Sequence, residues 1–191
     1  MSLLLKGKKT STEFNKKDND IKKWLRANAE KINVELINLT VGTVVYIDPK
    51  TKETITWVGS ADVKMVSMDT LLSMFTNGKS LIYDFVLGIG DIYFNTKKTY
   101  EFKEVIDALG LANIYKPFDY DIANVDGVII SSTLDEFEHI CKSLPVGAIE
   151  RLAERFCLIR DAGQIDSRSK ENTLTDIVGK LQMFRIIEDD E

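Results

Sequence analysis

Apolar residues recur every three or four positions along residues 131–179, and this helical period constrains the fold more than any other feature of the chain. Thr133 and Glu136 have the spacing of a capping box, which begins a helix. Pro145 has no N–H to donate and fits best in a first turn, so a second helix is expected to begin there. Gly163 can adopt the left-handed conformation that ends a helix. The pattern therefore predicts three short consecutive helices.

The period changes to two in the first half of the chain, where apolar side chains alternate with polar ones in three segments. This alternation is typical of strands, and a turn containing Pro49 separates the last two of them. A small sheet of this kind needs a helix packed on it to be stable. A separate amphipathic segment, which begins at Asp18 or Asn19 and runs to about Ile32, is predicted to be a helix. The predicted strands are residues 33–40, 42–48 and 52–59.

Together these patterns predict an α+β fold. Its expected elements are an N-terminal helix, a small antiparallel β-meander and a C-terminal helical half of three to four short helices. The chain has 191 residues, of which 44% are hydrophobic, so it can bury a sizeable core. Short apolar runs at residues 128–130 and 183–187 are predicted to be strands. The predicted parts are a flexible basic arm (1–15), an α+β part with the three-stranded meander (16–98), a mainly helical part (99–187) and an acidic tail (188–191).

The net charge of −5 is unevenly distributed along the chain. Residues 1–31 contain nine Lys or Arg and four acidic residues, so the rest of the chain is strongly acidic. Such asymmetry indicates either a nucleic-acid or membrane contact, or a basic segment that packs over the chain's own acidic surface. For the first alternative, the side chains expected to contact phosphates are Lys16, Lys17, Lys22, Lys23 and Arg26.

The predicted C-terminal helices carry arginines outside their apolar stripes. Arg is enriched at protein interfaces, so a partner-binding surface is one interpretation of these positions. The other interpretation is an ordinary solvated face. The candidate partner-binding residues are Arg151, Arg155 and Arg168.

Composition also bears on the compartment. Cys141 and Cys157 both lie on predicted apolar helix faces, which favours buried free thiols in a reducing cytosol over a disulfide. No run of about 20 apolar residues is present, so no membrane span or membrane partner is expected. The Lys, Asn and Ile content resembles that of AT-rich bacteria and their viruses. We therefore expect a cytoplasmic protein, found in the host cytoplasm or the virion if a phage encodes it.

No motif for catalysis, metal binding or cofactor binding stands out. The chain has one histidine, His139, and two cysteines, too few ligands for a structural zinc site. Asp91 with Glu101 and Lys103 has the residue types of a metal-dependent nuclease, but the apolar spacing around Lys103 predicts a helix where such a site needs a strand. No catalytic residue, metal ligand or cofactor is therefore assigned.

These observations favour a non-enzymatic protein that acts through protein–protein interaction. It would be an assembly or accessory factor, or a subunit of a larger particle, and its partner would be another protein or a second copy of itself. Nucleic-acid binding through the basic N-terminal segment is the alternative, and a metal-dependent nuclease is a second alternative. Whether the chain is an enzyme stays open, with a binding role preferred.

Overall fold

A computed structural model describes the backbone of residues 11–188 and, except at Ala123, the side chains of residues 16–179. The predicted arm over residues 1–10 and the end of the acidic tail lie outside the described residues. Helix α1 already begins at Ser11, so the last part of the segment predicted as an arm is helical. It ends at Ala27, where the 3-10 turn η1 (Ala29–Lys31) leads into the first strand.

The fold is α+β, with two small antiparallel sheets and a mainly helical second half, as the sequence predicts. The first half contains α1 (Ser11–Ala27), β1 (Ile32–Asn38), β2 (Val44–Ile47), β3 (Thr54–Trp57), β4 (Val63–Ser67), α2 (Met68–Asn77), α3 (Lys79–Tyr83) and β5 (Leu87–Phe94). The second half contains α4 (Phe102–Leu109), α5 (Ala112–Tyr115), η2 (Lys116–Phe118), η3 (Ile122–Asn124), α6 (Val125–Ser131), α7 (Leu134–Ser143), α8 (Val146–Asp161) and α9 (Arg168–Glu188).

Strand β1 is the centre of the larger sheet, whose order is β4-β1-β5. Side chains of β1 alternate between the two faces, and Val34 and Leu36 are fully buried on the inner one. The three predicted strands all exist, but their expected arrangement as one meander is wrong. Strands β2 and β3 form a separate hairpin, which packs on α2 through a hydrogen bond from the Tyr46 hydroxyl to Ser73 Oγ at 3.1 Å. Strand β4 was not predicted. Residues 88–91 were interpreted from the sequence as a turn, but they belong to β5.

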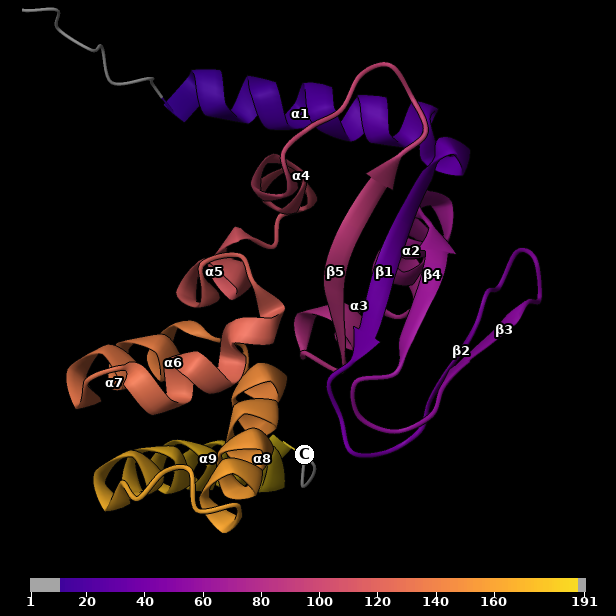
Figure 1. The fold of residues 1–191 in the computed structure, drawn as a ribbon. Helices are drawn as coiled ribbons and strands as arrows, with labels where there is room; N and C mark the ends of the chain where they lie inside the picture. Colours follow the sequence, from indigo (N-terminus) through magenta and orange to yellow (C-terminus); the bar gives the residue numbers. More distant parts are fainter. Residues whose placement is uncertain (1–10, 189–191) are drawn as a thin grey trace, which may run out of the picture.

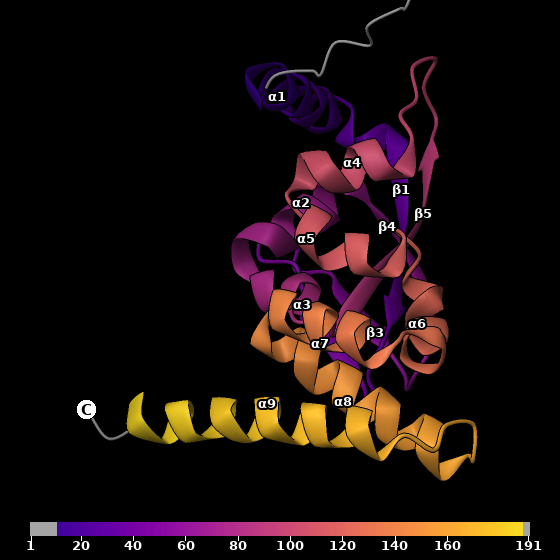
Figure 2. The same cartoon turned by 90° about the vertical axis from the view of Figure 1, so that its left-hand side faces the viewer.

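Helices cover one face of the larger sheet, as Figure 2 shows for α2, α4 and α5. Helix α1 lies at one end of the molecule and α8 and α9 at the other (Figure 1). Both halves contribute to a single cluster of buried side chains, from Leu25 of α1 to Phe156 of α8. The halves also share a hydrogen bond, because the backbone N–H of Ile89 in edge strand β5 donates to the buried Tyr115 hydroxyl of α5 at 2.6 Å.

The three predicted C-terminal helices are α7, α8 and α9. Thr133 and Glu136 form the expected capping box, and Gly163 has a φ of 71° at the end of α8. The two short strands predicted nearby are wrong: residues 128–130 belong to α6, and 183–187 belong to α9. Apolar runs this short do not distinguish a strand from a buried helix, so packing decides between them.

A buried lysine joins α9 to the end of α6. The Lys170 ammonium donates to the carbonyl oxygen of Ile129 at 2.7 Å, and its side chain is only 5% exposed. The last carbonyls of a helix lack partners within the helix, so this contact satisfies one of them. Burial lowers the pKa of Lys170 from its usual value. Cys141 is buried as predicted, whereas Cys157 lies on the outer side of α8 and is exposed.

Candidate functional site

A pocket of about 350 Å³ opens where the end of β1 meets α6 and α8. Its volume falls within the range usual for ligand or side-chain binding pockets. We call it the apolar pocket, because most of its lining side chains are hydrophobic. The lining residues are Ile37, Asn38, Leu39, Ser60, Ala61, Val63, Phe85, Phe118, Ile122, Val125, Asp126, Leu144, Ala148, Arg151, Leu152 and Arg155.

Close approach of β5 to η3 forms one wall of the apolar pocket. A Cβ atom at Gly88 would lie 2.8 Å from Ile122 Cγ1 and 3.0 Å from Leu39 Cδ1, so glycine is needed for this packing. The ring of Phe85 packs on that of Phe118, with centroids 5.6 Å apart. Gly88 therefore serves the packing of a strand, where the sequence alone suggested a turn.

Two of the three arginines predicted to bind a partner lie together at this pocket. Arg155 donates from Nε and Nη2 to the two carboxylate oxygens of Asp126, and both distances are 2.5 Å. This paired geometry is the strong form of an arginine–carboxylate contact, and it raises the pKa of Arg155. Arg151 donates from Nη1 to Glu154 at 2.6 Å. Arg168 does not line this pocket and is exposed at the start of α9.

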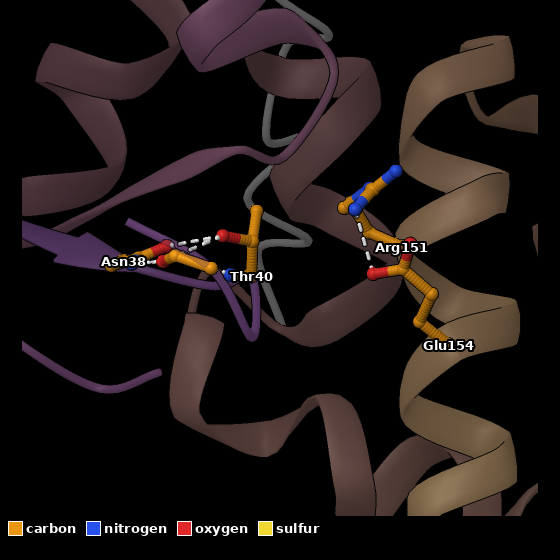
Figure 3. Close-up of polar contacts among 5 residues, drawn as sticks. Asn38, Thr40, Arg151 and Glu154 are labelled. Atoms are coloured by element: carbon orange, nitrogen blue, oxygen red, sulfur yellow. Dashed lines mark hydrogen bonds and ion pairs between the residues drawn. The ribbon is translucent and has the colours of Figure 1, made fainter. Parts of the chain in front are cut away.

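The sheet side of the pocket depends on Asn38, which is fully buried. Its Nδ2 donates to the carbonyl oxygens of Gly42 and Gly59, each at 2.7 Å. Its Oδ1 accepts from the backbone N–H and the hydroxyl of Thr40, each at 2.9 Å. All four hydrogen-bonding positions of the amide are thus used. Figure 3 shows Asn38 and Thr40 facing Arg151 and Glu154 across the space between the β1–β2 loop and α8.

Exposed apolar side chains are frequent in residues 41–65, the segment that contributes Ser60, Ala61 and Val63 to the apolar pocket. Of the ten large hydrophobic side chains exposed in the described part of the chain, six lie within residues 41–65. Val63 both lines the pocket and is 46% exposed, and Val58 at 70% precedes the lining residue Ser60. Concentrations of exposed apolar surface are typical of protein interaction sites. The six are Val41, Val45, Ile47, Val58, Val63 and Met65.

All five basic residues predicted to bind nucleic acid lie on α1, but they have different surroundings. Lys22 and Arg26 line a second pocket, beside α2 and α3, whereas Lys16 and Lys23 are exposed outside it. Lys17 forms an ion pair with Glu104 of α4 at 2.5 Å. Part of the basic segment thus packs on the chain's own acidic groups, which was the second interpretation of the charge asymmetry.

The side chains considered for catalysis either cap a helix or are exposed on different elements of the fold. Glu101 caps α4 in a capping box with Glu104. Asp91 is an exposed residue of β5, and His139 is exposed on α7. Within the described residues, no group of three or more His, Cys, Asp or Glu side chains is placed to hold a metal ion. None of the helices in that part of the chain is long and apolar enough to cross a membrane.

The sequence did not single out several residues that shape the apolar pocket. Asn38 read only as one polar position of a strand, and Phe85 lay in a segment whose secondary structure was ambiguous. The alternation of apolar and polar residues in β1 could have indicated that Asn38 is buried, because Asn38 falls on the same face of the strand as Leu36. Comparison of the chain with protein-family models, curated proteins and solved structures found no match.

Proposed function

We propose that the chain is a non-enzymatic interaction protein that receives an apolar side chain of a protein partner in the apolar pocket. It would act as an assembly or accessory factor. The observation that carries this proposal is the pocket itself, about 350 Å³ in volume and lined in part by the exposed side chain of Val63. An apolar centre with a polar rim is the usual anatomy of a protein interface.

The rim supports the same proposal. The side chains of Arg151 and Arg155 are 26% and 42% exposed at the pocket, so each can contact a bound chain. Both are already paired with carboxylates, which fixes their positions without removing all of their donors. Arginines held at the edge of an apolar pocket are typical of residues that contribute strongly to binding.

Two assays on one set of variants test this function. The purified chain is used to select binders from a displayed random-peptide library, and light scattering over a range of concentrations measures self-association. Val63→Glu places a charge in the pocket at a position that is already 46% exposed. Leu158→Glu is the matched control, because Leu158 is 44% exposed on α8 and does not line the pocket.

For the wild type and the Leu158→Glu variant, we expect either selected peptides that have an apolar residue in common or a defined oligomer. The Val63→Glu variant should lose this binding while its circular dichroism spectrum stays unchanged. A monomer that selects no peptide would overturn the proposal. Binding that Val63→Glu leaves intact would also overturn it.

A further inference from the structure

Four basic side chains from distant parts of the sequence line one pocket of about 630 Å³. Lys22 and Arg26 lie four residues apart on α1, which places them on the same side of that helix. Lys50 comes from the turn between β2 and β3, and Lys79 from the first residue of α3. Asp69 is the one acidic residue of the lining. We call this site the basic pocket; it shares no lining residue with the apolar pocket.

None of these four basic side chains forms an ion pair with another described residue. The ammonium of Lys79 lies 4.7 Å from the ring centre of Tyr83, which is a cation–π contact. Other cations of the structure do pair with carboxylates, namely Lys17, Lys64, Lys142, Arg151, Arg155 and Arg160. The basic pocket therefore combines a local excess of positive charge with groups that keep free donors, although the whole chain is acidic.

The fold holds the parts of the basic pocket in place. Asp48 accepts hydrogen bonds from the backbone N–H groups of Lys50 and Thr51, at 2.7 and 3.1 Å, so it fixes the turn that carries Lys50. The hairpin is attached to α2 by the hydrogen bond between Tyr46 and Ser73. On the other side, α1 is anchored by the fully buried Leu25. The basic residues thus stand on packed elements.

We propose that the basic pocket binds a phosphate group carried by a nucleotide or by a nucleic-acid strand. Lysines attract a phosphate as point charges, and an arginine can donate two parallel hydrogen bonds to its oxygens. The pocket is larger than an isolated phosphate ion needs. Two aromatic side chains in its lining, Phe75 and Tyr83, offer apolar surface to a base or sugar, and their rings pack edge to face with centroids 6.0 Å apart.

Isothermal titration calorimetry with three probes at low salt tests this site. The probes are inorganic pyrophosphate, adenosine triphosphate and a single-stranded twelve-nucleotide DNA. The pocket variant is Lys22→Gln with Arg26→Gln. The matched control is Lys16→Gln with Lys23→Gln, which removes the same charge from the same helix outside the pocket. Lys79→Gln tests the contribution of a segment distant in sequence.

We expect at least one probe to bind, and the Kd to rise at least about tenfold in the pocket variant and in Lys79→Gln. The control variant should change the Kd by less than about threefold, since it alters only the electrostatic potential around the protein and removes no contact in the pocket. Binding of the nucleotide without the DNA identifies a small-molecule site, whereas DNA binding that weakens steeply with salt identifies a strand. Absence of binding, or equal weakening in both double variants, would overturn the proposal. Val63→Glu should leave this binding unchanged, so the two proposals fail separately.

Discussion

Arg155 and Asp126 join α8 to α6 through two parallel hydrogen bonds at the edge of the apolar pocket. Both side chains are partly exposed, at 42% and 33%, so solvent screens part of their attraction. We expect Asp126→Ala to lower the free energy of unfolding by about 1 kcal/mol, measured by urea denaturation.

The exchanged pair, Arg155→Asp with Asp126→Arg, is the control for this contact. It should recover part of the loss, because the two groups can still meet with opposite charge. An Asp126→Ala variant as stable as the wild type would show that the contact contributes nothing to folding. A fully destabilised exchanged variant would show that packing, and not charge, dominates there.

The amide of Asn38 provides a second prediction, because it uses two donors and two acceptor positions in a fully buried site. Asn38→Asp keeps the shape but replaces the donors with oxygen, which faces the carbonyl oxygens of Gly42 and Gly59. We expect a loss of about 3 kcal/mol in the free energy of unfolding, measured by chemical denaturation. Thr40→Val removes a single side-chain donor and should cost less. Equal effects of the two changes would contradict this account.

The capping box of α7 predicts a dependence of stability on pH. Hydrogen bonds from the backbone and then the side chain of Thr133 lower the pKa of Glu136 below its usual value of 4.5. The folded state therefore favours the carboxylate. The resulting stability is present above pH 4.5 and is lost as the pH falls through the lower, folded-state pKa.

Thermal unfolding of the wild type and Glu136→Gln, followed between about pH 6 and pH 3, measures this dependence. The difference in stability between them should shrink as the pH falls, because glutamine does not titrate. A constant difference over this range would show that the ionisation of Glu136 is not coupled to folding.

The two cysteines should react very differently with a thiol reagent. Burial raises the pKa of the Cys141 thiol to about 12, so it holds little thiolate at neutral pH. Cys157 is exposed. Ellman's reagent should therefore titrate one thiol rapidly in the folded protein and a second only after denaturation. Cys157→Ser should abolish the rapid phase, and a rapid phase that persists would contradict the burial of Cys141.

The sequence predicted those elements whose signals are local. Helix α7 could be located because Thr133 and Glu136 cap it, and α8 could be bounded because Gly163 ends it. The pairing of β1 with β4 and β5 could not be predicted, since alternation gives the buried face of a strand but not its neighbours. Gly88 was interpreted as part of a turn for the same reason. A side chain is excluded there by Ile122, a residue distant in sequence.

In the candidate sites too, residues on one helix could be predicted from the sequence, whereas groupings of distant segments could not. Arg151, Arg155 and Arg168 were predicted as one surface because they lie outside the apolar stripes of the C-terminal helices, and Arg is enriched at protein interfaces. The pocket beside Arg151 and Arg155 could not be predicted, because its walls come from β1, η3 and α8. Lys22 and Arg26 were likewise predicted as basic residues of one helix. Their grouping with Lys50 depends on the hairpin packing against α2.

The hydroxyl of Tyr115 accepts a hydrogen bond from the backbone N–H of Ile89, on the open edge of β5 in the sheet β4-β1-β5. A fragment that stopped at residue 98 would lose this cover and would present an open strand edge together with the apolar side chains of Leu87 and Ile89. Open apolar edges recruit strands from other molecules, which leads to aggregation. Dissection of this protein into an N-terminal and a C-terminal piece would therefore yield an insoluble first piece, and functional mapping requires substitutions in the intact chain.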